Sequence, residues 1–186
     1  MLELSFPTMS AQEYLACEQK GDVRHEYVCG YTYALAGASQ RHSRISLNIA
    51  VHFWGLAQGK TCRVHQSDMK LRIEAEGSVF YYPDVMVVCD KSEPDPFFET
   101  EPCVLVEVLS PSTKNTDLRE KLTAYKGLPS VQTYLIVEAE RLVVRRFWKE
   151  TDGHWHQEDL TGDGDIALPC LGGTLTLPQI YRGVFS

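Results

Sequence analysis

The sequence predicts an α/β fold with a central mixed β-sheet, helices on the faces of the sheet and a β-rich C-terminal extension. Two apolar runs, VMVVC after Asp84 and CVLV before Glu107, are typical of central strands that are buried on both faces. Helical periodicity precedes and follows these runs, and Asp-Gly and Gly-Gly turns divide the last part of the chain. The length of 186 residues fits a single domain, residues 1–186.

The N-terminal part predicts a short helix followed by a β-hairpin. Ser10 and Glu13 have the spacing of a capping box, so we expect a helix that continues to about Lys20. The run EYVCGYTYAL, residues 26–35, is rich in aromatic and β-branched residues on both sides of its Cys-Gly dipeptide. This pattern indicates two short strands joined by a tight turn.

A longer helix is expected next. Ser39 can cap its first turn, and Gly59 is the kind of residue that follows a helix C-terminus. Apolar or half-apolar residues recur between them at helical spacing: Ile45, Ile49, His52, Phe53 and Leu56. This stripe should face the core.

The middle and the end of the chain alternate strand and helix patterns. Strands are expected at residues 62–66, 69–73, 79–88, 104–109, 133–137 and 142–148. Between them, Asp117 and Glu120 repeat the capping-box spacing, and Leu118, Leu122 and Tyr125 share one helix face before Gly127. A strand should therefore lead directly into this helix, and the residues after 148 should form a meander.

Composition excludes several classes of protein. The chain has 18 Lys and Arg against 25 Asp and Glu, a formal net charge of −7, which argues against coating nucleic acid through bulk charge. No apolar run is long enough for a membrane helix, and the N-terminus has no basic segment followed by an apolar one. We therefore expect a cytoplasmic protein without a membrane partner.

Six cysteines are scattered along the chain without a C-x-x-C pair, at positions 17, 29, 62, 89, 103 and 170. This spacing does not match a zinc ribbon or a disulfide framework. We expect all six to be reduced and mostly buried thiols.

Two carboxylates lie in apolar strand surroundings. Asp84 follows Tyr82-Pro83, and Glu107 lies within VLVEVLS. A buried carboxylate costs several kcal/mol unless it is ion-paired or bound to a cation, and two carboxylates on adjacent strands can hold one Mg²⁺. The plainer alternatives are a turn residue for Asp84 and an ion-paired acid for Glu107.

The Pro-Asp and Glu pattern resembles the PD-(D/E)xK nuclease superfamily, in which the two acids bind a metal ion and a lysine helps to activate water. The strings EYVCG, YYPDVMVV, VEVLSPST and REKLTAYKGLPSVQTYLIV resemble one family in particular, the Uma-two type of restriction-endonuclease-like proteins. The resemblance covers roughly residues 10–183. It implies a restriction-endonuclease-like fold for this chain.

One position departs from the superfamily pattern, because Leu109 stands where the lysine is expected. In the resembling family the lysine has moved to the following helix, where Lys121 matches it. With about 100° per residue, Lys121 lies about 60° from Leu118 on the helix, at the border of the apolar face. Its ammonium group can therefore reach toward Glu107.

The resemblance also places Glu26 at the metal ion as a third carboxylate. The residues alone leave other readings open for both new members of the site. Lys121 could be a solvated lysine paired with Asp117, and Glu26 could pair with Arg24 or His25.

Other chemically active residues have plainer readings. The SPST run, residues 110–113, is more simply a strand-to-helix turn than a nucleophile, because no histidine is linked to it in the sequence. His42 fits a capping or ion-paired residue better than a phosphate contact. His154 and His156 alternate as in an exposed strand and have no third ligand nearby.

By this resemblance, the expected function is metal-dependent hydrolysis of phosphodiester bonds in nucleic acid, with DNA as the first candidate. Glu26, Asp84 and Glu107 would hold Mg²⁺ or Mn²⁺, and Lys121 would orient the attacking water or stabilise developing charge. Cutting both strands would need two subunits, which favours a homodimer. The alternatives are a non-catalytic nucleic-acid or protein-binding module with the nuclease fold, and a hydrolase of small phosphoesters.

Overall fold

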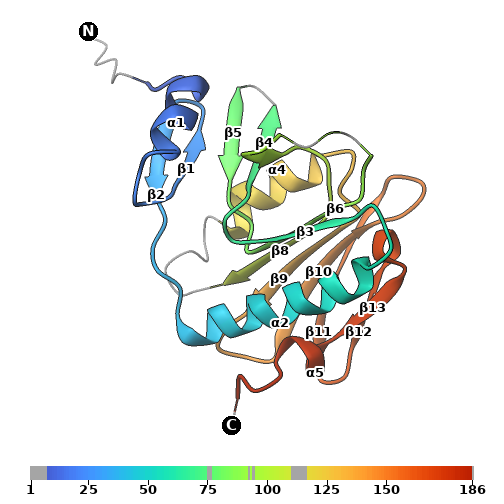
Figure 1. Cartoon of the computed structure of the whole chain (residues 1–186). Coiled ribbons are helices and arrows are strands. Elements are labelled where there is room, and N and C mark those ends of the chain that lie inside the picture. Colours follow the sequence, from blue (N-terminus) through green and yellow to red (C-terminus); the bar gives the residue numbers. More distant parts are fainter. Residues whose placement is uncertain (1–7, 75–76, 92, 94, 110–116, 186) are drawn as a thin grey trace, which may run out of the picture.

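The computed structural model describes residues 8–74, 77–91, 93, 95–109 and 117–185. At its centre is a six-stranded mixed sheet with the order β11-β10-β9-β8-β6-β3 (Figure 1). The strands are β3 (Arg63–Gln66), β6 (Val85–Val88), β8 (Pro102–Leu109), β9 (Thr133–Glu138), β10 (Val143–Lys149) and β11 (Trp155–Thr161). Strands β8 and β9 are parallel and the other neighbours are antiparallel. The predicted mixed sheet is therefore confirmed.

A second sheet has five strands in the order β2-β1-β5-β4-β7. Its members are β1 (His25–Val28), β2 (Tyr31–Ala34), β4 (Lys70–Glu74), β5 (Ser78–Tyr81) and β7 (Phe98–Glu99). Strands β1 and β2 form the predicted hairpin. The single strand predicted at 79–88 is wrong, because residues 82–84 separate β5 from β6 and the two strands belong to different sheets. Pro83 has no amide hydrogen to donate to a ladder, so the chain leaves one sheet there and Asp84 falls at the junction.

The two predicted helices of the N-terminal part lie on either side of the β1–β2 hairpin in the chain. Helix α1 (Ala11–Glu18) begins with the predicted capping box of Ser10 and Glu13. Helix α2 (Gln40–Ala57) is capped by Ser39, and it crosses one face of the six-stranded sheet (Figure 1). Its inner face contributes Ile45, Ile49 and Phe53 to the core, whereas His52 and Leu56 are only partly buried.

The helix predicted after the SPST run begins differently from the expectation. It starts as a π-helical turn, η1 (Asp117–Lys121), and continues as the short helix α4 (Leu122–Lys126). The SPST run and the side chains of residues 117 and 118, including the predicted capping group, lie outside the described residues. Of the residues predicted for the apolar face of this helix, Tyr125 is fully buried.

The C-terminal extension is β-rich, as predicted, but it also contains short helices. Its elements are β12 (Asp165–Leu168), the 3-10 turn η2 (Pro169–Leu171), β13 (Gly173–Thr176) and α5 (Leu177–Ile180). Strands β12 and β13 pair with each other, and α5 packs against α2. Among the described helices, none is long and apolar enough to cross a membrane.

Strand β8 lies between two apolar clusters, and all eight of its residues are buried. Val104, Val106 and Val108 face the cluster that contains the inner side chains of α2. Leu105 and Leu109 face the opposite cluster, which contains residues of the five-stranded sheet and Tyr125 of α4. Because side chains alternate along a strand, Glu107 points to this second side.

The expectation of six reduced and mostly buried cysteines is wrong. Disulfides join Cys62 to Cys89 and Cys103 to Cys170, across sequence separations of 27 and 67 residues, and the free Cys17 and Cys29 are exposed. Folding brings the Cα atoms of the two pairs to 4.1 and 6.5 Å. Local spacing in the sequence could not show these pairs, because each joins segments that meet only in the folded sheet.

Candidate functional site

Asp84, the last residue of the β5–β6 junction, lies beside Glu107 of strand β8. Val85 pairs with Val106 in the antiparallel β6–β8 ladder, and one further step of this register places Asp84 against Glu107. Opposed residues of an antiparallel pair project from the same face with Cβ atoms about 5 Å apart. Like charges at such positions repel each other, so this pair of acids requires a compensating cation.

Hydrogen bonds to both carboxylates fix this geometry. Asp84 Oδ2 accepts a hydrogen bond from the backbone N–H of Val108 at 2.7 Å, which ties the β5–β6 junction to β8. Glu107 Oε1 accepts one from the Tyr125 hydroxyl at 2.7 Å. Two oxygens of each carboxylate can take several partners, so both retain acceptor capacity.

Lys121 supplies one positive charge. Its Nζ lies 3.2 Å from Glu107 Oε2 and 3.0 Å from Glu26 Oε1, and all three side chains are buried. Lys121 and Tyr125 are four residues apart, so the η1–α4 segment presents both to the two oxygens of Glu107. The prediction that Lys121 reaches Glu107 is confirmed.

Glu26 enters the site from the other sheet. Its Oε1 accepts a hydrogen bond from the Tyr82 backbone N–H at 3.3 Å in addition to its ion pair with Lys121. The alternative partners of Glu26 are engaged elsewhere, because Arg24 pairs with Asp68 and His25 pairs with Glu18. Lys121 therefore joins β1 of one sheet to β8 of the other.

His42 is a member of the site that sequence reasoning did not select. Its Nε2 lies 3.2 Å from Asp84 Oδ2, and its side chain is 13% exposed. His42 contacts a carboxylate, as the ion-paired interpretation expects, and that carboxylate is the candidate metal ligand. The sequence feature that could have pointed to His42 is its position three residues after the Ser39 cap, which fixes it in the first turn of α2.

A cavity of about 170 Å³ opens over these side chains. Polar and charged residues that line it include Arg24, His42, Tyr82, Asp84, Glu107 and Lys121. Solvent and a small part of a substrate can therefore reach Asp84, Glu107 and Lys121 together. Glu26 does not line this cavity and lies behind Lys121.

Tyrosines around the site are held in their neutral form. Burial raises the pKa of Tyr125 well above its ordinary value, and the nearby charge of Glu107 raises it further. Burial, with a smaller contribution from Glu26, raises the pKa of Tyr81 to about 12. The Tyr125 hydroxyl therefore remains a hydrogen-bond donor to Glu107 throughout the neutral range.

The remaining candidates do not join the site. Leu109 is 3% exposed and packs in the apolar cluster beside Tyr125, so the usual lysine position is part of the core. His156 is exposed on β11, where it pairs with Glu150, which fits the exposed-strand reading.

The donor set fits a divalent ion held by two carboxylates. Asp84 and Glu107 offer oxygen ligands on one face, and Mg²⁺ commonly binds through one or two carboxylates while it keeps several waters. Among the described residues, Glu26, Asp84 and Glu107 do not form a group whose ligand atoms all lie within 4.8 Å of one another. The third-ligand role of Glu26 stays a prediction, and its observed partner is Lys121.

A mixed sheet that presents two opposed acids beside a lysine defines a class, the restriction-endonuclease-like α/β proteins. The fold supports this class directly: it matches a crystal structure described as a "putative nuclease belonging to DUF820" from Anabaena variabilis, with a TM-score of 0.76. The match covers 95% of this chain and 99% of that chain at 16% identity.

Residues 11–178 match the model of the Uma2 family, described as "Putative restriction endonuclease", and the chain belongs to this family. Two relatives from Synechocystis sp. are also similar. The uncharacterized protein slr1290 is 34% identical over 180 residues, covering 96% of this chain and 94% of the relative. The uncharacterized protein sll1609 is 30% identical over 158 residues, covering 83% and 89%. The predicted family and fold are therefore confirmed.

Proposed function

We propose that this protein is a metal-dependent endonuclease that hydrolyses phosphodiester bonds of DNA. The observation that carries the proposal is the buried Glu107, which has Asp84 opposite it and Lys121 at 3.2 Å beside the same cavity. A purely structural role does not explain why two acids lie together at the lining of a cavity. Family and fold support the same activity.

In this proposal Asp84 and Glu107 hold Mg²⁺ or Mn²⁺. The bound ion would lower the pKa of its water and offset the charge of the phosphate in the transition state. Val108 keeps Asp84 in place through its backbone N–H, and Tyr125 and Lys121 orient Glu107. His42 Nε2 lies against the same Asp84 oxygen, Oδ2, that accepts the Val108 hydrogen bond, and it restricts the rotation of that carboxylate.

Lys121 acts on the reacting groups in the proposed mechanism. It lines the cavity, so its ammonium group can donate a hydrogen bond to a phosphate oxygen or to the attacking water. Glu26 is the positioning residue, because its ion pair holds Lys121 at the edge of the cavity from behind. Lys121 thus takes the role of the superfamily lysine, whose usual position is occupied by Leu109 in this chain.

Cleavage of supercoiled plasmid tests the proposal. Wild type with Mg²⁺ or Mn²⁺ should cut, chelation should stop cutting, and Asp84→Asn and Glu107→Gln should each lower the rate by about 10²-fold or more. Glu158→Gln is the matched control, since Glu158 pairs with Arg146 on β10 and β11, away from the cavity lining.

Parallel reactions define the substrate. They use single-stranded DNA, RNA and a simple phosphodiester. Cutting that persists in Glu107→Gln would reject the assigned site. Wild type that binds nucleic acid but cuts none of the substrates would favour the binding module, and turnover of the simple ester alone would favour a small-molecule phosphoesterase.

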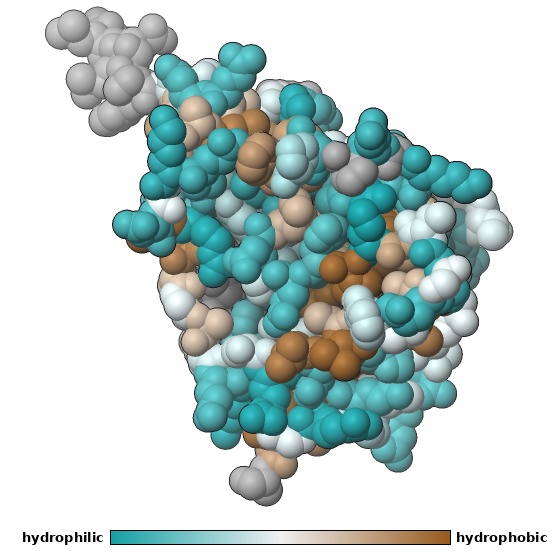
Figure 2. Space-filling view, in the orientation of Figure 1, coloured by the Kyte–Doolittle hydropathy of each residue, from teal (hydrophilic) through white to brown (hydrophobic). Residues whose placement is uncertain are grey.

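We also propose that the active form is a homodimer, because one site cuts one strand at a time. The supporting feature is a stripe of exposed apolar side chains on α2, formed by Leu47, Val51 and Trp54. Figure 2 shows apolar surface gathered along this helix, which faces the viewer. The stripe borders a groove lined also by Val64 of the edge strand β3, and exposed patches of this kind commonly mark interfaces.

A further inference from the structure

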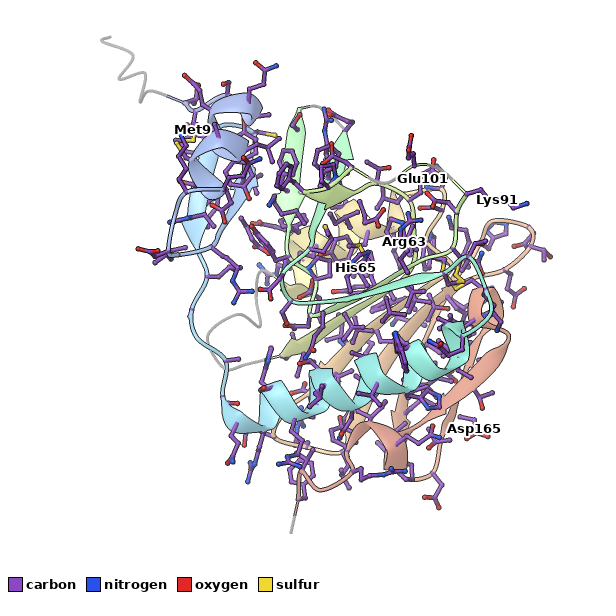
Figure 3. All side chains as sticks on the ribbon, viewed as in Figure 1. Met9, Arg63, His65, Lys91, Glu101 and Asp165 are labelled. Atoms are coloured by element: carbon purple, nitrogen blue, oxygen red, sulfur yellow. A yellow bond between two sulfur atoms is a disulfide. The ribbon has the colours of Figure 1, made fainter. Side chains whose placement is uncertain are left out.

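Four cysteines from separate segments meet at one end of the six-stranded sheet. Cys62 precedes β3, Cys89 follows β6, Cys103 is in β8 and Cys170 is in η2. The sulfur atoms of Cys89, Cys103 and Cys170 all lie within 4.8 Å of one another, and Cys62 is bonded to Cys89. In Figure 3 yellow sulfur atoms lie close together on the right of the view, below the labelled Lys91. The two disulfides are therefore parts of one four-sulfur cluster.

This cluster is separate from the carboxylate site. Cys103 and Glu107 are four residues apart on β8, which corresponds to about 13 Å at 3.3 Å per residue. The β6–β8 ladder shifts register between Val87 and Val88, next to Cys103, so simple alternation does not carry from Glu107 to Cys103. The cysteine cluster packs against the apolar core on the α2 side of the sheet, whereas Glu107 points to the opposite side. A ligand of the four cysteines would not be the ion of the proposed nuclease.

The arrangement of the sulfurs suits a single zinc ion. In a tetrahedral site with Zn–S bonds of about 2.3 Å, neighbouring sulfurs are about 3.8 Å apart. The sulfurs of Cys89, Cys103 and Cys170 lie within 4.8 Å of one another, and Cys62 Sγ is next to that of Cys89, so the four sulfurs are gathered on the scale of one ion. An iron–sulfur cluster would hold its cysteine sulfurs farther apart than one ion does. The compact group thus favours a mononuclear tetrathiolate.

A positive group lies next to the cluster. The Lys60 ammonium donates a hydrogen bond to the carbonyl oxygen of Leu171, the residue after Cys170, and Lys60 is itself two residues from Cys62. A zinc ion with four thiolates carries a net charge of −2, which such a cation partly offsets. Cys103 is buried and the other three cysteines are partly buried, so the site would be closed to bulk solvent, as structural zinc sites are.

We propose that Cys62, Cys89, Cys103 and Cys170 form a structural zinc site when their sulfurs are reduced. A dithiol reductant of the thioredoxin class converts the two disulfides into four thiols, with two equivalents of dithiol oxidised to disulfide. One Zn²⁺ then replaces four protons to give the tetrathiolate. In the reducing cytoplasm that the sequence predicts, thiols are kept reduced, and zinc would take over the cross-linking role of the disulfides.

The same four residues would then fasten η2 to the sheet in both redox states. Cys170 is the member from the C-terminal extension, and the other three belong to the sheet or its immediate ends. Reduction without metal would release this attachment, and zinc would restore it. Metal content and redox state therefore have to be measured together.

The experiment starts from protein reduced under anaerobic conditions, with six free thiols verified by titration and the reductant then removed. After addition of Zn²⁺ and desalting, we expect one zinc per chain by elemental analysis. Co²⁺ in place of zinc should give the intense visible absorption of a tetrahedral site and the ultraviolet bands of four thiolates. Cys103→Ser and Cys170→Ser should each lower zinc affinity by 100-fold or more.

Two controls separate this site from other binding. The double variant Cys17→Ser/Cys29→Ser removes the two exposed thiols and should retain one zinc per chain. Glu107→Gln should also retain it, whether or not the variant cuts DNA, which keeps this test independent of the proposed nuclease.

Several results would overturn the zinc site. The first is a fully reduced wild type that retains no zinc. The second is a Cys103→Ser/Cys170→Ser variant whose zinc content is unchanged. The third is a protein that shows iron–sulfur absorption after reconstitution with iron and sulfide but forms no stable zinc complex. If reduction unfolds the chain, added zinc must restore the near-ultraviolet circular dichroism, and failure to do so would equally reject the site.

Discussion

At the scale of single residues, Lys121 is the centre of the site. It contacts Glu26 and Glu107 from the two sheets, and all three groups are buried. A buried carboxylate that loses its cation keeps the full cost of desolvation, which makes removal of one partner more harmful than removal of the whole network. The stability of the site therefore depends on the balance between its buried carboxylates and the Lys121 ammonium group.

Replacing Lys121 by Met should lower the free energy of unfolding by about 3–5 kcal/mol, because two buried carboxylates lose their shared cation. Adding Glu26→Gln and Glu107→Gln to Lys121→Met should recover much of this loss. Urea denaturation measures both effects, with the exposed Lys20→Met as the control. A Lys121→Met variant as stable as wild type would show that the ion pairs contribute little.

Tyr125 predicts how stability depends on alkaline pH. Its pKa is raised in the folded protein by burial and by Glu107, so its contribution is fully present below the unfolded value of about 10 and is lost as pH rises toward the folded value. Above pH 10 this one group should lower the free energy of unfolding by about 1.4 kcal/mol per pH unit. Tyr125→Phe should remove that share of the slope, whereas Tyr31→Phe at an exposed position should not.

The residues that sequence reasoning found and missed differ in a physical way. Family resemblance selected Lys121, and helical periodicity placed it at the border of a buried face, whereas apolar flanks marked Glu107 as an unusual acid. Glu26 was suggested only by family resemblance, because its partner lies in a different sheet. The cysteine pairs were missed for the same reason, since they depend on contacts between distant segments.

At the scale of elements, the N-terminus of α2 connects helix capping to the site. Ser39 Oγ accepts a hydrogen bond from the backbone N–H of His42 at 3.2 Å, and the His42 side chain contacts Asp84. The cap thus stabilises the helix and also fixes the position of a side chain over the candidate metal ligand. Stability and activity should be coupled at this helix end.

Ser39→Ala should lower the free energy of unfolding by about 1 kcal/mol and should also reduce cleavage, because the first turn of α2 loosens around His42. Ser10→Ala removes the equivalent cap of α1, which is remote from the cavity lining, and should cost a similar amount of stability without a loss of cleavage. Thermal unfolding and plasmid cleavage measure the two effects. An equal loss of cleavage in both variants would show that His42 has no specific role in cleavage.

The boundary between β5 and β6 is one that the sequence pattern did not predict. Residues 79–88 read as one apolar strand because β5 and β6 are both buried, and apolar content does not reveal that they belong to different sheets. Pro83 was the local sign of the break. The same junction creates the site, since the turn through residues 82–84 places Asp84 opposite Glu107.

At the scale of the whole molecule, the fold class followed from the order of patterns in the sequence, whereas the arrangement into two sheets did not. The parallel pairing of β8 with β9 around the η1–α4 segment agrees with the strand–helix–strand order. The second sheet is assembled from the hairpin β1–β2 and strands that come after α2, so its strand order depends on long-range contacts.

The proposed dimer gives a final prediction about the whole molecule. Val51 lies in the middle of the exposed apolar stripe of α2 and is 60% exposed, so Val51→Lys should leave the fold of one chain intact while it places two charges in the interface. Light scattering should give twice the mass of one chain for wild type and the mass of one chain for Val51→Lys. Because separated subunits cut one strand at a time, Val51→Lys should accumulate nicked plasmid where wild type yields linear product. Val23→Lys, at another exposed apolar position, should behave as wild type. A monomeric wild type that still linearises plasmid in single encounters would rule out the dimer, whereas a dimeric Val51→Lys would show that subunits associate through a different surface.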